Sequence, residues 1–347
     1  MREPVFLSIL VSAALLAPGV GYAEDPATVV VFSGPTMGTR YTVRVAGPPL
    51  GETGRAAVSG VIEHELAEID RLLSTWNPES EISRFNRHFS TAPFEVEATT
   101  LSVLDLAQRV AEQSGGAFDV TVAPLVEAWG FGPGGRASAA PSPERLAELR
   151  QRVGFSLLAL DRQSRTVTKA RPDVSCDLSA LAPGWAADRI AEGLARLGHS
   201  DVIVDIGGEV SARGRRADGS RWRVAVESPG RTPPSLVLEL EDAAVATSGD
   251  YRNSWQDKGG RRRSHLIDPR TGEPVAHGLA SVTVVHHDAA WADALATALL
   301  VLGPEAGPAF AAREGLGARF VVRDSTGAYS GTDTPQFDAL VLGEVSR

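Results

Sequence analysis

Two stretches in the first third of the chain repeat apolar residues with the period of an α-helix. The first runs from Ser59 to Leu73, and the second runs from Thr99 to Gln113 with Gly115–Gly116 as a stop signal. Pro143 to Val153 and Ala186 to Leu197 predict two further helices.

Short runs rich in β-branched residues separate these helices and predict strands. Because strands and helices follow one another without a strict β-α-β order, the pattern favours an α+β fold over a doubly wound sheet. We predict one domain over residues 24–347, with mixed or antiparallel sheets and a long insertion around residues 128–145. The predicted strands are Thr28–Ser33, Thr39–Val45, Ser156–Leu160, Thr166–Ala170, Val202–Ile206, Trp222–Val226, Ser235–Leu240, Ala243–Thr247, Ser281–Val285, Ala318–Val322 and Leu340–Leu342.

One predicted helix, Ala292 to Leu302, is apolar on every side except for Asp293 and Thr297. A helix that is apolar all round is buried, and residues four apart share a face. A buried carboxylate needs a partner, and no Lys or Arg lies in this helix. A hard cation such as Mg²⁺ suits two oxygen ligands of this kind. Two alternatives remain open: Asp293 is a helix N-cap, or the Thr297 hydroxyl bonds back to its own helix.

Composition narrows the class of protein. The chain has 347 residues, 43% hydrophobic and 22% charged, which is typical of a globular domain. Its net charge of −9 argues against nucleic acid as a partner, because such proteins carry a basic face. Cys176 is the only cysteine, so no internal disulfide forms, and its apolar flanks favour a buried small hydrophobe over a nucleophile.

The N-terminus has the pattern of a secretory signal peptide. Arg2 precedes an apolar run from Val5 to Ala17, and small residues precede a cleavage site after Ala23. We therefore predict that residues 1–23 are removed and that the protein is exported to the periplasm. This location is compatible with association with the inner membrane. An uncleaved anchor is the alternative, and the absence of a cysteine near the site argues against a lipoprotein.

Two glycine-containing segments are candidates for chemistry. Gly115 to Pro124 runs from a helix end into a predicted extended segment, where Asp119 is either a site residue or a cap of the turn. Asp177 to Ile190 is a loop that enters the Ala186 helix and would offer free backbone N–H groups to an anion, although Asp177 also suits a structural cap.

Two further segments follow in the second half of the chain. Ala246 to Arg252 places Thr and Ser at a strand end before Gly249 and Asp250, which suits phosphate or cation contacts as well as a simple turn. Ser264 to Val275 contains the strong turn sequence Asp268 to Gly272, and His265 at its start is a candidate site residue or a structural histidine.

Seven motifs in this order resemble the ApbE family, the FAD:protein FMN transferases. They are MGTRYTV, TWNPESEISRFN, GGAFDVTVAPL, DLSALAPGWAAD, VATSGDYRN, SHLIDPRTGEPV and ADALATALLVLG, between Met37 and Gly303. The resemblance implies an ApbE-like α+β fold, binding of FAD and Mg²⁺, and transfer of FMN to a Thr or Ser hydroxyl of a target protein. It also implies an acceptor that is a subunit of a membrane redox complex.

The resemblance assigns roles to individual positions. Asp293, Thr297 and the backbone carbonyl of Ala180 resemble magnesium ligands. His265, Asp250 and Asp119 line the same site as candidate catalytic groups, and an acidic residue such as Asp250 or Asp119 could take the proton of the acceptor hydroxyl. The positions that resemble flavin- and adenosine-binding residues are Met37, Trp76, Ala117, Phe118, Asp119, Asp177, Pro183 and Leu266.

Pro183 is a departure from the family pattern, because many members carry Lys there. Loss of that lysine weakens FAD binding or moves its charge to another group, such as Arg189 or the cluster Arg261–Arg263. Two alternative functions therefore stay open: an Mg²⁺-dependent FAD pyrophosphatase that gives FMN and AMP, and a non-catalytic periplasmic protein that binds or delivers FAD.

Overall fold

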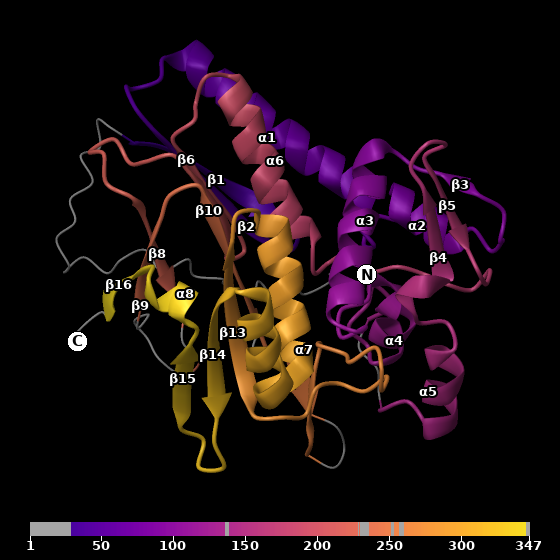
Figure 1. Ribbon diagram of the computed structural model, residues 1–347. Coiled ribbons are helices and arrows are strands. Elements are labelled where there is room, and N and C mark those ends of the chain that lie inside the picture. The colour runs from indigo at the N-terminus through magenta and orange to yellow at the C-terminus, as the bar shows by residue number, and fades with distance from the viewer. Residues whose placement is uncertain are drawn as a thin grey trace, which may run out of the picture.

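The computed structural model describes residues 29–135, 139–227, 229, 236–250, 253–256 and 260–344. An antiparallel sheet of eight strands forms its centre (Figure 1). The predicted α+β class is confirmed, and every pairing in this sheet is antiparallel. The spatial order is β1 (Val29–Thr36), β2 (Thr39–Ala46), β6 (Val202–Ile206), β7 (Glu209–Arg213), β10 (Ala243–Gly249), β13 (Leu279–His286), β14 (Gly317–Arg323) and β15 (Tyr329–Asp333).

The two faces of this sheet are covered by different layers. Val202 and Val204 of β6 pack in the main core under the helices α6 (Ala182–Arg196) and α7 (Ala289–Glu314). Ile203, between them, points to the other face and packs in a second core. Side chains alternate across a strand, so one short apolar run supplies both cores. The second core is closed by β8 (Trp222–Val226), β9 (Leu236–Leu240), β16 (Val341–Glu344) and α8 (Pro335–Asp338).

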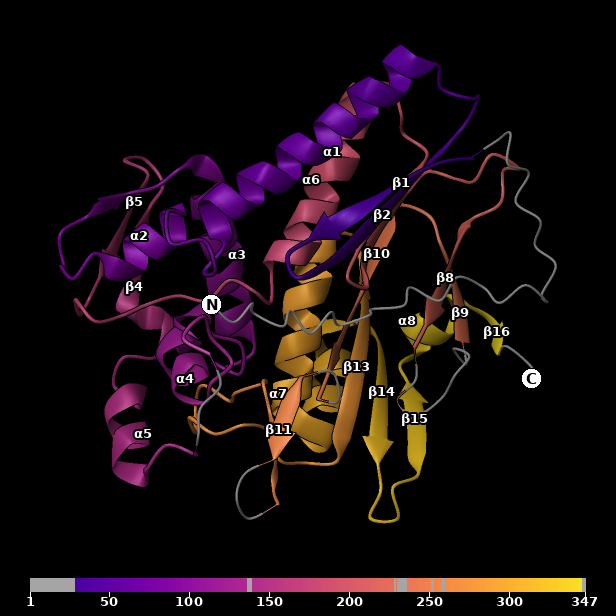
Figure 2. The same cartoon turned by 180° about the vertical axis from the view of Figure 1, so that it is seen from behind.

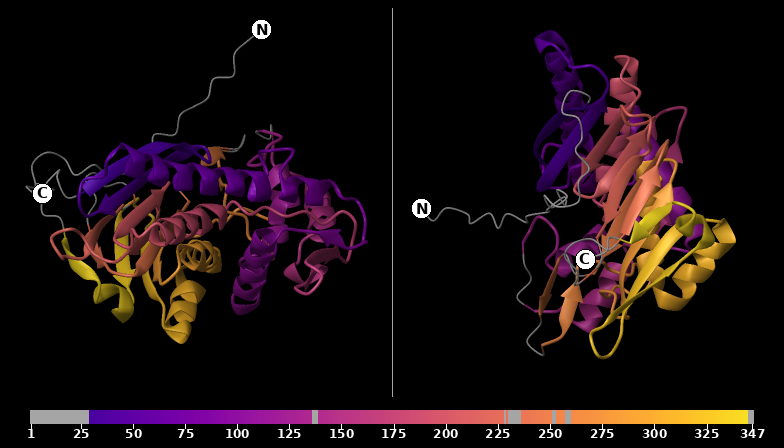
Figure 3. Two further views of the ribbon diagram at one scale, coloured as in Figure 1. Left: turned by 90° about the horizontal axis from the view of Figure 1, so that it is seen from above. Right: turned by 90° about the vertical axis from the view of Figure 1, so that its left-hand side faces the viewer.

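A second lobe lies beside the helical face of the sheet (Figures 1 and 2). The long helix α1 (Glu52–Leu73) packs along α6 and leads from the sheet into this lobe, as the view from above shows (Figure 3). Helix α1 begins seven residues before its predicted start. The remaining elements are α2 (Glu81–Arg87), β3 (Phe94–Glu95), α3 (Ala98–Gln113), α4 (Ala123–Ala128), α5 (Pro143–Arg150), β4 (Leu158–Asp161), β5 (Thr166–Lys169) and the hairpin of β11 (Ser254–Gln256) and β12 (Arg262–Ser264).

The predicted insertion around residues 128–145 is part of this lobe. Trp129 lies in a small core with Leu125 and Leu149, and its indole N–H donates to the Gly272 carbonyl oxygen at 2.8 Å. The segment therefore packs against the turn of residues 268–272 and does not project from the domain. Residues 136–138 of the predicted loop lie outside the described residues.

Helix α7 is longer than the predicted segment and contains a break. Gly303, at φ 86° and ψ −175°, interrupts it before Pro304. Among the described residues this is the one helix long and apolar enough to cross a membrane, but 61% of its apolar window is buried inside the protein. Its apolar surface is therefore accounted for by packing on β10, β13 and α6.

Helix α6 begins at Ala182, so the predicted start at Ala186 was wrong by one turn. Pro183 lies in the first turn, where the missing N–H costs no helical hydrogen bond. The predicted loop therefore extended too far, because a proline is compatible with the first turn of a helix.

Candidate active site between helices six and seven

Asp293 lies where α6 and α7 cross. A side chain at Gly184 would overlap with the backbone of Ala289 and Ala290, so the two helices touch through their backbones. The Asp293 side chain is 6% exposed, and its Oδ2 accepts a hydrogen bond from the Gly184 N–H at 3.3 Å. No basic side chain of the described residues lies within ion-pair distance of this carboxylate. The predicted burial of this carboxylate is confirmed.

Burial raises the pKa of Asp293 to about 7, because the charged form loses its solvation. The Gly184 N–H opposes this shift only in part. A bound cation would supply the charge that the protein itself does not.

The N-cap interpretation of Asp293 was wrong. Helix α7 begins at Ala289, after the cap residue Asp288, so Asp293 is its fifth residue. The cap bond to this helix comes instead from α6, where Asp188 Oδ2 accepts from the Ala290 N–H at 3.1 Å. Ser211 donates a hydroxyl to the other oxygen of Asp188 at 2.9 Å. The start of α7 is therefore fixed by a contact between two residues 102 positions apart in the chain.

Thr297 lies one turn after Asp293, and its hydroxyl is 2.9 Å from the Ser248 hydroxyl of β10. The alternative in which Thr297 bonds back to its own helix is thus replaced by a bond to the sheet. Thr247, next along β10, bonds Thr283 of β13 at 2.9 Å. The segment from Ala246 is therefore part of a regular strand up to Gly249; Tyr251 and Arg252 lie outside the described residues.

The donor set fits Mg²⁺ bound together with a phosphate substrate. The described residues contain no group of three or more His, Cys, Asp or Glu that could enclose a metal. Mg²⁺ does not require such a cage, since it is often held by one or two carboxylates with substrate phosphates and water. Asp293 and Thr297 offer oxygen ligands on one face, and Ala180 lies in the turn directly before α6.

The side chains of Asp119 and Asp177 each accept hydrogen bonds from the residue two positions later, and a backbone hydrogen bond at Val120 joins their two segments. Asp119 Oδ1 accepts from the Thr121 N–H at 2.8 Å and from its hydroxyl at 2.6 Å, which starts a 3-10 turn at Val120–Val122. Asp177 Oδ1 accepts from the N–H of Ser179 at 2.9 Å and from its hydroxyl. The Asp177 N–H donates to the Val120 carbonyl at 2.7 Å. The extended segment predicted after Asp119 is helical, because this cap starts the turn that leads into α4.

The predicted flavin-binding positions divide into buried and exposed ones. Ala117, Phe118 and Leu266 are 1%, 4% and 8% exposed, so their side chains belong mainly to the core. Met37 and Trp76 are 39% and 67% exposed. The side chains of these two residues are therefore accessible from the surface, and those of the other three are not. In the view of Figure 2, the closed end of the β1–β2 hairpin points toward the middle of the molecule.

The three candidate catalytic residues have different partners. Asp250 is buried, and its Oδ2 accepts from Arg262 at 2.9 Å and from Arg323 at 3.0 Å. Asp119 is occupied by its cap bonds, and burial raises its pKa. His265 lies near Phe131, and its Nδ1 is 3.0 Å from the Asn253 carbonyl oxygen. Because a carbonyl oxygen only accepts hydrogen bonds, this contact makes Nδ1 the donor.

The cations suggested as substitutes for a lysine at Pro183 are engaged elsewhere. Arg189 lies 3.4 Å from Glu65 of α1 and 2.8 Å from Glu192. Arg262 binds Asp250, and Arg263 lies over the Trp129 ring at 5.3 Å. Arg263 thus contacts the second lobe, whereas Arg262 contacts the end of β10 in the main sheet.

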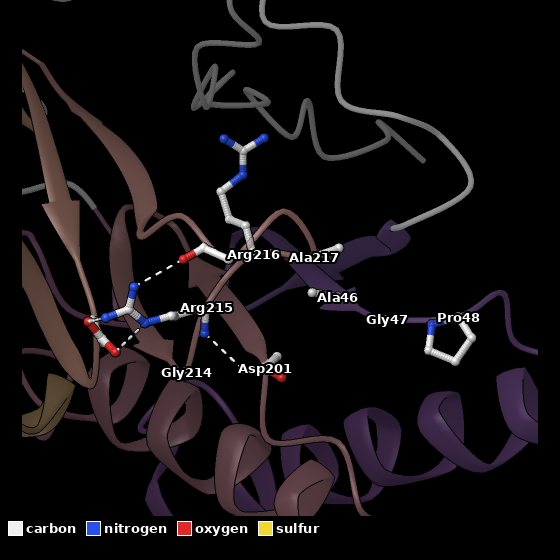
Figure 4. Close-up of a pocket in the computed structure, with 10 residues that line it drawn as sticks. Ala46, Gly47, Pro48, Asp201, Gly214, Arg215, Arg216 and Ala217 are labelled. Atoms are coloured by element: carbon white, nitrogen blue, oxygen red, sulfur yellow. Dashed lines mark hydrogen bonds and ion pairs between the residues drawn. The ribbon is translucent and has the colours of Figure 1, made fainter.

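A separate hollow of the described surface lies beside the ends of β2 and β7 (Figure 4). Its volume is about 700 Å³, and Asp201, Arg215 and Glu241 are among its lining residues. Arg215 is committed to Glu241 through two bonds of 2.6 and 2.7 Å. None of the predicted site residues lines this hollow, so it is not the candidate site.

Several residues that shape the site were not predicted. Asp188 and Arg323 belong to helix and strand surfaces that look ordinary in sequence, and only their long-range contacts show their role. Cys176 is buried, and burial raises the pKa of its thiol, so the interpretation as a small hydrophobe is confirmed.

Comparison with known proteins agrees with the motif order. The profile of the ApbE family matches residues 37–320. A protein of Vibrio cholerae named FAD:protein FMN transferase is 40% identical over 324 residues, 93% of this chain and 95% of that protein. Its namesake in Escherichia coli strain K12 is 34% identical over 344 residues, 96% and 97% of the two chains.

Solved structures give the same result. The flavin transferase ApbE from Vibrio cholerae aligns with a TM-score of 0.82 at 37% identity, over 91% of this chain and all of that one. The apo form of the Pseudomonas stutzeri flavinyl transferase ApbE aligns with a TM-score of 0.82 at 39% identity, over 90% and 96% of the two chains. Sequence profile, relatives and fold agree, and the chain belongs to the ApbE family.

Proposed function

We propose that this protein is an FAD:protein FMN transferase that moves FMN from FAD to a Thr or Ser hydroxyl of an exported acceptor protein. The observation that carries the proposal is the buried Asp293 carboxylate, which has one weak N–H partner and no basic neighbour. The names of its relatives support the reaction, and the resemblance supports a subunit of a membrane redox complex as acceptor.

The reaction breaks one bond and forms one bond. The acceptor hydroxyl oxygen attacks the phosphorus on the FMN side of the pyrophosphate, the bond to the AMP oxygen breaks, and AMP leaves. When bound at Asp293, Thr297 and the Ala180 carbonyl, Mg²⁺ supplies positive charge at the pyrophosphate. The protein holds the two substrates in line and excludes competing water.

His265 is the best candidate to accept the proton of the hydroxyl. The Nδ1 contact with the Asn253 carbonyl oxygen orients its ring, and an imidazole is the side chain that most often accepts a proton in catalysis. Asp250 is a weaker candidate because two guanidinium groups bind one of its oxygens. Asp119 is weaker too, because its cap bonds hold it in place as part of a turn.

The test is mass spectrometry of a candidate acceptor after incubation with FAD, Mg²⁺ and this protein. Transfer adds the mass of an FMN phosphoester to a Thr or Ser and releases one AMP for each modified acceptor. FMN and AMP released at equal rates with and without acceptor would support the pyrophosphatase instead. FAD binding without AMP release would support a binding or delivery protein.

A further inference from the structure

Asn86, at the end of α2, makes a two-point contact with the backbone of a distant segment. Its side-chain amide donates to the Cys176 carbonyl oxygen at 2.8 Å, and its Oδ1 accepts from the Cys176 N–H at 2.7 Å. The two residues are 90 positions apart. The amide thus pairs with Cys176 as a neighbouring β-strand would, and each backbone group has a single matching partner.

The end of α2 is itself held firmly. The Lys169 ammonium is 1% exposed and donates to the carbonyl oxygens of Phe85 at 2.7 Å and His88 at 3.1 Å. It also lies 4.4 Å from the centre of the Phe85 ring. A buried cation on the last carbonyls of a short helix fixes that end, so Asn86 projects from a rigid support.

The paired residue Cys176 comes directly before the turn that enters the active site. Asp177 bonds Val120 on one side and caps Ser179 on the other. The Leu178 carbonyl accepts from the N–H groups of Leu181 and Ala182, which closes the turn containing Ala180 and starts α6. Two residues later, Gly184 donates to Asp293. A shift of Cys176 would therefore move the Asp177–Leu181 turn relative to Asp293.

From this chain of contacts we infer that Asn86 is a positioning residue: it sets the place of the Asp177–Leu181 turn relative to Asp293 and so controls the binding of FAD with Mg²⁺. The inference rests on the proposed function for the identity of the ligands. Asn86 acts through Cys176 and touches neither substrate.

The test compares three variants by titration with FAD in the presence of Mg²⁺, followed by flavin fluorescence, and by their melting temperatures. Asn86→Ala removes both bonds, and Asn86→Asp turns the donor into an oxygen that repels the Cys176 carbonyl. Thr334→Val is the matched control, because Thr334 also bridges one backbone N–H and one carbonyl, those of Ala318 and Leu316, both at 2.8 Å. Its position beside α8 lies across the sheet from α2 (Figure 1).

We expect both Asn86 variants to raise the Kd for FAD, and the Mg²⁺ concentration for half-maximal binding, at least tenfold. Thr334→Val should lower the melting temperature by a similar amount and leave both binding values within twofold of wild type. Asn86 variants that are only less stable, with unchanged binding, would overturn the inference. Failure of both variants to fold would also overturn it, because Asn86 would then be a requirement of the fold.

The same titration separates this inference from the proposed function. If wild-type protein binds FAD but modifies no acceptor, the transferase proposal fails while the effect of Asn86 on binding is still measured. If wild-type protein transfers FMN and the Asn86 variants bind FAD as well as it does, only the inference about Asn86 fails.

Discussion

Asp293 combines two properties that conflict in the absence of a ligand. It is buried at a backbone contact between two helices, and it carries a charge that no side chain of the described residues neutralises. Such a group destabilises the metal-free protein, and binding of a cation removes this cost. The two effects predict opposite responses of stability and activity when the charge is removed.

Replacing Asp293 by Asn should stabilise the metal-free protein at pH 8 and abolish transfer. Burial raises the pKa of the folded-state carboxyl to about 7, above its ordinary value of 3.8. The folded state therefore holds the proton more tightly than the unfolded state does. The stability that this proton uptake contributes is fully present below about pH 4 and is lost as the pH rises through 7. The difference in melting temperature between variant and wild type, measured with a chelator present, should therefore grow from pH 4 to pH 8. Parallel curves would contradict this.

The same variant should respond differently to Mg²⁺. Wild-type protein with FAD should gain melting temperature when Mg²⁺ is added, and Asp293→Asn should not, because the ligand is gone. We expect a loss of at least about 100-fold in transfer rate, equivalent to a few kcal/mol of transition-state stabilisation. Retained activity in this variant would rule out Asp293 as the metal ligand.

At the scale of elements, the site depends on how closely α6 approaches α7. Gly184 permits a backbone contact that no larger residue allows, and Asp188 caps α7 from the same helix. Asp293 and the turn before α6 are thereby fixed relative to each other. A change at this contact should affect both stability and ligand binding.

A pair of Gly→Ala substitutions tests this contact. Gly184→Ala should destabilise the protein by about 1–3 kcal/mol and weaken Mg²⁺ binding, because its methyl group meets the Ala289 carbonyl. Gly60→Ala, on the exposed side of α1 with no neighbouring atom within 4 Å, should stabilise it by up to about 1 kcal/mol through helix propensity. Urea unfolding measures both; equal effects of the two substitutions would contradict close packing at Gly184.

At the scale of the whole molecule, the N-terminal segment bears on where the reaction takes place. Residues 1–23 have the pattern of a signal peptide and lie outside the described residues. The first described strand, β1, begins at Val29, five residues after the predicted mature start. We therefore propose that the described domain is exported and encounters its acceptor outside the cytoplasm.

Mass spectrometry of the protein purified from expressing cells tests the export proposal. The mature chain should begin at Glu24, and a bulky side chain in Ala23→Phe should prevent cleavage because the site requires a small residue. An intact chain that begins at Met1 in the membrane fraction would favour the uncleaved anchor instead.

The sequence determined most of the elements and pointed to the candidate site. Apolar periodicity located helices α3, α5 and most strands, since burial imposes the period of each element on its apolar residues. Two polar residues in the apolar run of α7 marked the candidate metal site, because burying a carboxylate without a partner costs free energy. The strands β7 and β15 were missed because their sequences, EVSAR and YSGTD, carry few apolar residues.

The tertiary structure decided which groups meet. The sequence left the N-cap of α7 open, and the fold supplied it from Asp188, a residue with no local signal. Packing likewise placed helix α6 one turn earlier than its apolar pattern indicated and joined Asn86 to Cys176 across 90 positions. Local sequence reports the period and polarity of an element, whereas partners distant in the chain are selected by close packing and by the need of every buried polar group for a matching donor or acceptor.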